Sequence, residues 1–425
     1  MRRITGFLVV FLLFCSGILT TSATEWPQWR GPNRDGVSDE VGLLKEWPGS
    51  GPKVLWNIPL GEGFSGISVS QGRVYTMFSE GNDEFVVCLD ATDGGEIWRF
   101  RSDKNYHEGQ GGNGPRATPT IDGDLLFTIS AHGKLYALNA ASGQEVWSHD
   151  LQQKFGSKMP RWGFSTSPLV DGELLLVEVG GKGEKSIVAF NKNSGDVVWS
   201  SHKDKLGYSS PIAITVQGVR QLICFTGTQL VSISPVDGII YWQYPWKTGY
   251  DVNAATPVFI PPDKVFISSG YDKGAAVLQM RVFVSIDDDR AATEQIRENQ
   301  GRVRIKEIWK NRKMKNQFSS SVLHENYLYG FDNSILKCIE ANTGEEQWKS
   351  RGFGKGTVIL ADGHLIILSD RGKLGLAEAT PAGYIEKASA KVLSGLCWTV
   401  PTLANGKLYV RNEAEMICLD MTGQH

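Results

Sequence analysis

The chain has 425 residues, of which 41% are hydrophobic and 21% are charged, with a formal net charge of −2. This balance excludes a disordered chain and argues against a general nucleic-acid binder. Glycine (48 residues) and tryptophan (13 residues) are abundant, which indicates many turns and strands and therefore an all-β fold.

The first 23 residues have the layout of a secretory signal peptide. A basic head precedes an almost uninterrupted apolar run over residues 4–19, and Thr21 and Ala23 precede a plausible cleavage point. We therefore predict a signal peptide over residues 1–23, a periplasmic or extracellular location, and no transmembrane span after cleavage. A retained signal anchor is the alternative.

Residues 24–53 are rich in Trp, Pro and Gly and show no periodicity. We expect them to form an irregular segment that wraps the outside of the following domain or covers one of its faces. The five cysteines beyond residue 23 are widely spaced, without a CxxC or an adjacent pair. Buried, unpaired thiols are expected, because such spacing is not a disulfide framework.

An eleven-residue phrase recurs along the chain, with Gly at its seventh position and Trp at its eleventh. The five full copies are residues 88–98, 137–147, 189–199, 232–242 and 338–348. Three degenerate copies begin at residues 285, 376 and 418. The last copy lacks its Trp strand, and residues 54–58, at the other end of the chain, are the expected donor.

Each repeat unit contains four expected strands. Asp-Gly or Asn-Gly turns, such as those at residues 122–123 and 405–406, separate apolar runs, and this pattern is typical of β-hairpins. Four strands in a unit of about 40–50 residues are typical of a propeller blade. The Trp-type strands fall at positions 56, 98, 147, 199, 242, 309, 348 and about 386. We predict an all-β fold over residues 54–425: an eight-bladed β-propeller with four-stranded antiparallel blades. The N-terminal strand closes the ring by pairing with the C-terminal blade.

The repeated phrase resembles the tryptophan docking motif of the PQQ-like (pyrroloquinoline quinone) β-propellers. The resemblance covers residues 54–423 and has two implications, because the family contains both quinoprotein dehydrogenases and non-catalytic propellers similar to BamB. For a dehydrogenase it implies Ca²⁺ held by carboxylate and amide oxygens, an Asp base, a Trp platform and often an adjacent Cys pair. This chain has no adjacent Cys pair and no haem-attachment motif.

Residues that enter the innermost strands are expected to face the central axis. The candidates for a cofactor or ligand site are Arg116, Arg161, Trp162, Asp251, Asn253, Gln317, Lys355 and Trp398. Cations and aromatic rings at one funnel mouth fit an anionic aromatic ligand. The alternative is that these side chains satisfy turn backbones and hydrate the channel. The glycine-rich loop 108–114 lies between strands and therefore does not fit a nucleotide-binding loop.

An insertion is expected at about residues 288–305. Residues 290–315 carry nine Lys or Arg and three Glu, so the region either contacts an acidic partner or an anionic envelope surface, or is a solvated loop. The carboxylate run 287–289 lacks the spaced alternation of a cation-binding loop, and we interpret it as a solvated turn. We predict no metal site.

Taken together, these features predict a non-catalytic protein-binding or assembly scaffold of the cell envelope, similar to BamB. No catalytic residue and no bound cofactor are predicted, and the chain is expected to be a monomer with an envelope protein as partner. A quinoprotein dehydrogenase that uses PQQ with calcium to oxidise alcohols or sugars is the alternative. A carbohydrate- or peptide-binding sensor is a third possibility.

Overall fold

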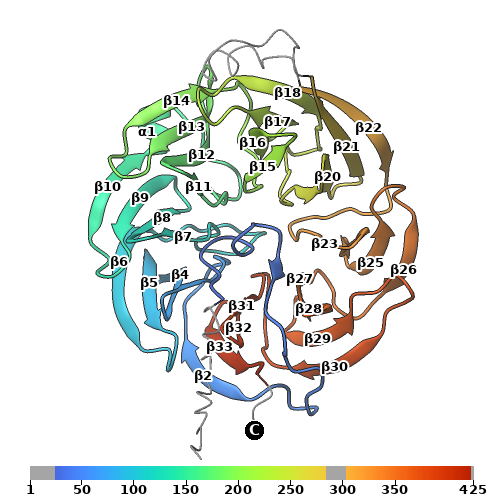
Figure 1. The fold of residues 1–425 in the computed structure, drawn as a ribbon. Coiled ribbons are helices and arrows are strands. Elements are labelled where there is room, and N and C mark those ends of the chain that lie inside the picture. Colours follow the sequence, from blue (N-terminus) through green and yellow to red (C-terminus); the bar gives the residue numbers. More distant parts are fainter. Residues whose placement is uncertain (1–23, 284–302, 423–425) are drawn as a thin grey trace, which may run out of the picture.

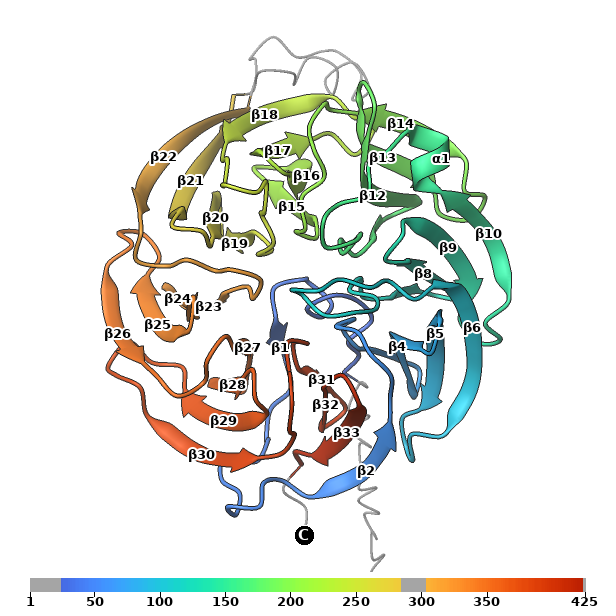
Figure 2. The same cartoon turned by 180° about the vertical axis from the view of Figure 1, so that it is seen from behind.

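The computed structural model describes residues 24–283 and 303–422, which form eight sheets arranged as a ring around a central axis (Figure 1). The prediction of an eight-bladed propeller is confirmed. In blades 1 to 7 the first strand in the chain lies nearest the axis and the last lies at the rim, as both views show (Figures 1 and 2).

Blades 1 to 4 are built from consecutive antiparallel strands. Blade 1 comprises β3 (Ser68–Ser70), β4 (Arg73–Glu80), β5 (Asp83–Asp90) and β6 (Glu96–Lys104). Blade 2 comprises β7 (Thr120–Asp122), β8 (Leu125–Ile129), β9 (Lys134–Asn139) and β10 (Glu145–Asp150). Blade 3 comprises β11 (Leu169–Asp171), β12 (Leu174–Gly181), β13 (Lys185–Asn191) and β14 (Val197–Ser201). Blade 4 comprises β15 (Ile212–Val216), β16 (Val219–Phe225), β17 (Gln229–Ile233) and β18 (Ile240–Pro245).

Blades 5 to 7 follow the same order. Blade 5 comprises β19 (Val258–Ile260), β20 (Lys264–Ser269), β21 (Gly274–Val282) and β22 (Val303–Asn311). Blade 6 comprises β23 (Val322–His324), β24 (Tyr327–Asp332), β25 (Ile335–Glu340) and β26 (Glu346–Ser350). Blade 7 comprises β27 (Thr357–Ala361), β28 (His364–Leu368), β29 (Lys373–Glu378) and β30 (Glu386–Lys391), and a fifth strand, β1 (Val37–Ser38), runs parallel to β27 at its inner edge.

Blade 8 joins the two ends of the chain. It comprises β31 (Thr402–Ala404), β32 (Lys407–Arg411), β33 (Glu415–Asp420) and, at the rim, β2 (Val54–Pro59). Trp56 of β2 lies opposite Cys418 of β33, as Trp98 lies opposite Cys88 in blade 1. The predicted closure of the ring is therefore confirmed.

The middle strands of each blade are almost continuously buried, as in β16 and β28, because neighbouring blades cover both faces of the sheet. In the rim strands, such as β14 and β26, buried residues alternate with exposed ones, because only one face of the strand packs inward. All five cysteines beyond residue 23 are buried and unpaired, as predicted. Within the described ranges the one helix is α1 (Leu151–Phe155), and no helix is long and apolar enough to cross a membrane.

The rim tryptophans join each blade to the next. The indole N–H of Trp98 donates to the carbonyl of Ala140 (3.0 Å), and that of Trp147 donates to the carbonyl of Lys192 (3.0 Å). Both acceptors stand at the fourth position of the next copy of the phrase. The seventh-position glycine has φ near +75° and lies under the preceding tryptophan: a Cβ on Gly143 would be 2.6 Å from Trp98. Glycine is therefore required there by both backbone conformation and space.

Residues 24–36 do not wrap the outside of the ring; they run into its centre, where Figures 1 and 2 show the first described residues beside the innermost strands. Trp26 pairs with Val69 in blade 1, Pro27 accepts from Ile121 in blade 2, and Gly36 accepts from Leu360 in blade 7. The chain then passes outward to β2. We call residues 26–36 the axial segment.

Two predicted features lie outside the described residues. These are the signal peptide, residues 1–23, and residues 284–302, which contain the 287–289 carboxylate run and most of the expected insertion. The basic run continues into β22, which begins at Val303.

Candidate functional site

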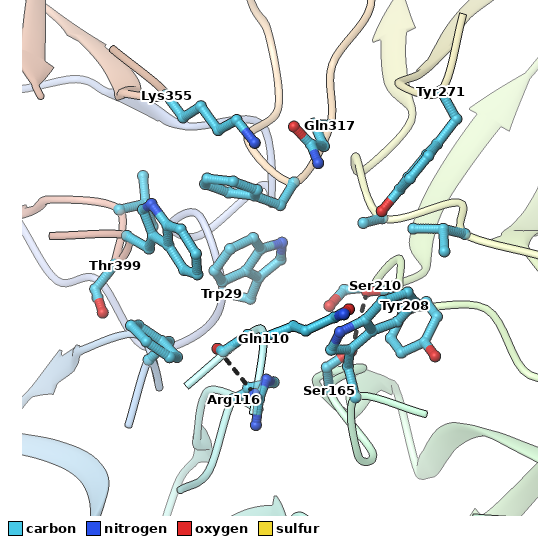
Figure 3. Close-up of a pocket in the computed structure, with 18 residues that line it drawn as sticks. Trp29, Gln110, Arg116, Ser165, Tyr208, Ser210, Tyr271, Gln317, Lys355 and Thr399 are labelled. Carbon is cyan, nitrogen blue, oxygen red and sulfur yellow. Dashed lines mark hydrogen bonds between the residues drawn. The ribbon is translucent and has the colours of Figure 1, made fainter. Parts of the chain in front are cut away.

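A pocket of about 350 Å³ opens on the axis at one end of the ring (Figure 3). The loops that lead into the innermost strands form its walls. Its lining residues are Trp29, Phe64, Gln110, Gly111, Arg116, Trp162, Ser165, Tyr208, Ser210, Val252, Ala254, Tyr271, Gln317, Phe318, Lys355, Trp398, Thr399 and Val400. No Asp, Glu, His or Cys is among them.

The residues that form the walls occupy the same position in most blades, relative to the start of the innermost strand. The residue four positions before the innermost strand lines the pocket in seven of the eight blades. These residues are Phe64, Arg116, Ser165, Tyr208, Ala254, Phe318 and Trp398. In blade 7 the lining residue is Lys355, two positions before β27, because Phe353 is buried in the core beside it.

The axial segment supplies the centre of the pocket. In Figure 3, Trp29 lies in the middle of the ring of lining residues. Its indole N–H donates to Thr256 Oγ1 at 2.8 Å, which anchors it to blade 5. The axis is therefore partly filled by the chain itself, and the pocket is the space that remains above this segment.

Two groups of aromatic rings face this space. On one side Trp398 contacts Phe64 and Phe318, with ring centroids 5.2 and 5.0 Å apart. On another side Trp162 and Tyr208 meet edge to face at 5.6 Å. Apolar walls of this kind bind flat or ring-shaped groups by dispersion and exclusion of water.

The glycine-rich loop forms part of the rim and is held by Arg116. The Arg116 guanidinium donates to the carbonyls of Gly111 (3.1 Å), Gly112 (2.7 Å) and Gly114 (2.8 Å). Burial lowers the pKa of Arg116, but the carbonyl oxygens satisfy its donors. Arg116 thus acts mainly on the loop, which presents Gln110 and Gly111 to the pocket.

Lys355 differs from Arg116. Its side chain extends into the space above Trp29 next to Gln317 (Figure 3). Among the described residues, its ammonium has no hydrogen-bond or ion-pair partner; only its backbone N–H donates, to Asp370 (3.0 Å). Lys355 is therefore the cation in this lining that is available to a ligand.

Further positive charge lies buried around the axis. Arg30, Arg34 and Arg411 are at most 2% exposed, and burial lowers the pKa of each, to about 10, 9 and 9 respectively. They remain charged at neutral pH and donate to backbone carbonyls, such as Arg30 to Ser321 (2.7 Å) and Arg411 to Met77 (2.7 Å). Within the described part of the chain none of the three has an ion-pair partner.

A second, smaller cavity of about 20 Å³ adjoins the pocket and shares four lining residues with it: Trp29, Phe318, Trp398 and Val400. Three of its lining residues have a buried polar atom without a partner: Arg30 Nε, Thr357 Oγ1 and Trp398 Nε1. This space suits one water molecule bridging those groups. Its N–H donors and the Arg30 charge lie directly beside the pocket.

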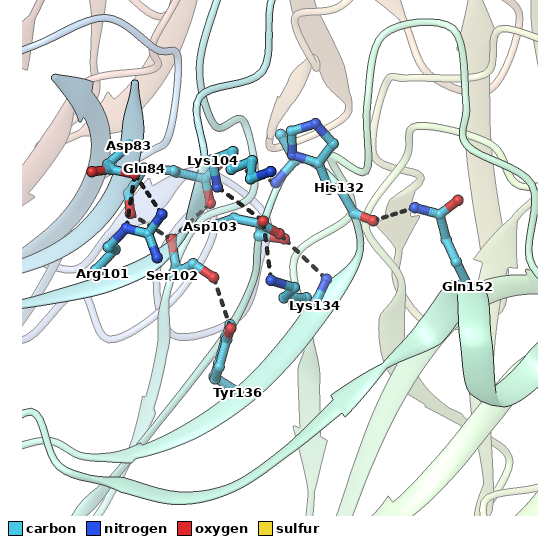
Figure 4. Close-up of polar contacts among 12 residues, drawn as sticks. Asp83, Glu84, Arg101, Ser102, Asp103, Lys104, His132, Lys134, Tyr136 and Gln152 are labelled. Atoms are coloured by element: carbon cyan, nitrogen blue, oxygen red, sulfur yellow. Dashed lines mark hydrogen bonds and ion pairs between the residues drawn. The ribbon is translucent and has the colours of Figure 1, made fainter. Parts of the chain in front are cut away.

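Two buried carboxyl groups contribute little negative charge. Burial raises the pKa of Glu84 and of Glu178 to about 8, so both are mainly protonated at neutral pH. Glu84 accepts from Ser102 Oγ (2.8 Å) and lies beside Asp103, which pairs with Lys134 (3.1 Å; Figure 4). These two carboxyls therefore offset little of the positive charge of the buried arginines, whose nearest carboxylates are Asp35 for Arg30 and Glu413 for Arg411.

Five of the eight predicted site residues line the pocket: Arg116, Trp162, Gln317, Lys355 and Trp398. Arg161 lies beside it, with its guanidinium 5.0 Å from the Trp162 ring centroid and bonded to Gln110 (2.9 Å). Whether any of these residues binds a ligand remains a prediction.

Asp251 and Asn253 have other partners. Asp251 pairs with Lys205 at 2.6 Å. Asn253 is fully buried, and its amide donates to the carbonyls of Thr226, Gly227 and Trp246. These two residues support the blade 4 and 5 loops and do not line the pocket.

The sequence analysis missed Trp29, Phe64, Tyr271 and Phe318. Two of these, Phe64 and Phe318, follow the four-residue offset given above, which would have identified them. Trp29 had no such signal. In residues 24–283 and 303–422 there is no group of three or more His, Cys, Asp or Glu side chains placed to hold a metal ion.

Comparisons with known proteins give two kinds of relative. Residues 82–350 match the family described as "Outer membrane protein assembly factor BamB". The crystal structure of BamB from Moraxella catarrhalis has a TM-score of 0.61 and 13% identity, covering 87% of this chain and 99% of that one. The quinohemoprotein alcohol dehydrogenase ADHIIG from Pseudomonas putida HK5 has a TM-score of 0.51 and 11% identity, covering 95% and 81%. At these identities the structures share the fold alone.

Among curated proteins, the quinoprotein alcohol dehydrogenase PedH of Pseudomonas putida is 22% identical over 164 residues. The match covers 36% of this chain and only 26% of PedH.

Proposed function

From the premise that the chain belongs to the family of the outer membrane protein assembly factor BamB, we propose that it is a non-catalytic scaffold that binds a protein partner in the cell envelope. The partner is an envelope protein, and the surface offered to it consists of the blade loops. The predicted signal peptide supports the location.

The chemistry of the axial pocket carries this proposal. A hydrolytic or redox site needs a group that accepts or donates protons, and none of the lining residues is Asp, Glu, His or Cys. Lys355, Tyr208 and Tyr271 remain as possible bases. Burial raises the pKa of Tyr208 to about 12, which keeps its phenol protonated at neutral pH, and the lining has no carboxylate or imidazole that could activate Lys355 or Tyr271. Arg116 is committed to the carbonyls of the 108–114 loop.

The alternative is a quinoprotein dehydrogenase, which the similarity to ADHIIG and PedH favours. The family resemblance implies that PQQ would be bound together with calcium, a hard cation that takes carboxylate and amide oxygens. The lining offers the amides of Gln110 and Gln317 but no carboxylate, and Asp251 and Asn253 are engaged elsewhere. The donor set therefore does not fit calcium-bound PQQ.

The test has two arms. Purified protein is titrated with PQQ, with and without Ca²⁺, and assayed for alcohol- and sugar-dependent dye reduction; we expect neither saturable binding nor turnover. The protein is also isolated from its native envelope under mild conditions, where we expect one protein to co-elute at fixed stoichiometry and to rebind when purified. Calcium-dependent, one-to-one PQQ binding with dye reduction would establish the dehydrogenase instead.

A further inference from the structure

We propose that the axial pocket binds an aromatic ligand carrying a carboxylate, without a metal ion, and that Lys355 receives the carboxylate. This proposal does not rest on the proposed scaffold function, since the ligand occupies the axial pocket and not the outer blade loops.

The size and the walls of the pocket define the body of the ligand. A volume of about 350 Å³ is at the small end of ligand sites and suits one or two rings. The lining includes the Trp398–Phe318 pair and the Trp162–Tyr208 pair. Figure 3 shows Trp29 in the middle of the lining residues. A flat apolar group can pack against these rings.

The charges define the polar end. Lys355 has no partner among the described residues and extends into the pocket beside the Gln317 amide (Figure 3). Arg30, fully buried below, adds positive potential without a carboxylate bonded to it. No acidic residue lines the pocket, so an anionic group bound there meets no carboxylate.

The same features argue for one carboxylate and against a polyanion. One ammonium is free, whereas the guanidiniums of Arg116 and Arg161 are already bonded to the 108–114 loop. A second or third anionic group would therefore lack a partner in a mainly apolar site, which is unfavourable.

The ligand has two possible sources with the same chemistry: a free aromatic acid, or the C-terminal residue of a polypeptide. The probes are N-acetylphenylalanine and its neutral amide, measured by isothermal titration calorimetry with purified protein in EDTA and again in Ca²⁺. We expect the acid to bind about tenfold more tightly than the amide, as a charge-assisted hydrogen bond requires, and calcium to have no effect.

Two variants and a control locate the interaction. Lys355→Gln removes the charge and leaves a polar side chain one atom shorter, and it is expected to bring the acid-to-amide ratio to about one. Trp162→Ala is expected to weaken the binding of both probes. Lys185→Gln removes an exposed charge from blade 3 and should leave the ratio unchanged. Circular dichroism of each variant confirms that it is folded.

A hexapeptide ending in Phe distinguishes the sources. Binding at least as tight as that of N-acetylphenylalanine, and lost on amidation, assigns the site to a chain terminus; weaker binding assigns it to a free acid. The proposal is overturned if neither probe binds at millimolar concentration, if acid and amide bind equally to the unmodified protein, or if Lys355→Gln leaves the preference intact.

Discussion

At the rim of the ring, tryptophans make the same contact from blade to blade, whereas at the axis the equivalent positions carry different side chains. Six rim indoles, from Trp56 to Trp348, donate to a backbone carbonyl of the following blade. In contrast, the residues four positions before the innermost strands range from Ala254 to Arg116 and Trp398.

This difference separates two tasks. The rim contact repeats because each blade must bury its faces against its neighbours, and one geometry serves all of them. At the axis every blade contributes one loop to a shared space. The residues of these loops do not have to repeat from blade to blade, so they can differ in a way that suits a ligand. Blade 4 is an exception to the rim contact. Its indole, that of Trp242, donates to Gln221 Oε1 of the same sheet (3.0 Å) and not to a carbonyl of the following blade.

The largest effect of a single substitution is expected at the axis. Arg34→Met removes the guanidinium bonds to the carbonyls of Ser167 and Pro168 and to Gln28 Oε1; Pro168 keeps the bond from Thr120 Oγ1. We expect a loss of about 3–5 kcal/mol in the free energy of unfolding. Urea denaturation followed by tryptophan fluorescence measures it. Arg220→Met, which breaks an exposed pair with Asp171, is the control and should cost about 1 kcal/mol or less. Equal losses would mean that the axial segment does not stabilise the ring.

A smaller effect is expected at the rim. Gly143→Ala places a Cβ 2.6 Å from Trp98 at a residue with φ of +73°, and we expect it to destabilise the protein by about 2–4 kcal/mol. Gly123→Ala has a similar φ of +58° but nothing within 4 Å of the new atom, so about 1 kcal/mol is expected. If the two variants unfold at the same urea concentration, the tryptophan contact is not what requires glycine.

The third comparison concerns the dependence of stability on pH. Burial raises the pKa of Glu84 and Glu178 from 4.5 to about 8, so the folded protein holds protons that the unfolded chain has released between these values. Stability therefore falls as pH rises from about 5 to 8. We expect the double variant Glu84→Gln, Glu178→Gln to flatten this slope in urea titrations.

Glu340 is the matched rim carboxylate for that experiment. Although partial burial acts to raise its pKa, hydrogen bonds from Thr343 and Asn342 lower it below 4.5. Glu340 is thus ionised in both folded and unfolded states above pH 5, and Glu340→Gln should leave the slope unchanged. A slope that survives in the double variant would contradict the assignment to the two buried carboxyls.

Much of the candidate site was predictable because the repeat fixes where each inner loop begins. Arg116, Trp162, Gln317, Lys355 and Trp398 were identified from their places ahead of the innermost strands. Asp251 and Asn253 were placed there by the same reasoning, but their side chains turn to Lys205 and to buried carbonyls. Sequence position gives the loop, whereas side-chain direction depends on which partners lie nearby.

The sequence by itself determined the blades, their number and the closure of the ring, because each of these depends on a local phrase repeated at regular spacing. Only the tertiary structure decided the path of the axial segment. Its anchors are contacts between residues far apart in the chain, such as Arg30 with Ser321 and Arg34 with Pro168, separated by 291 and 134 positions. Such contacts leave no periodic signal, since backbone carbonyls are the acceptors and every residue carries one.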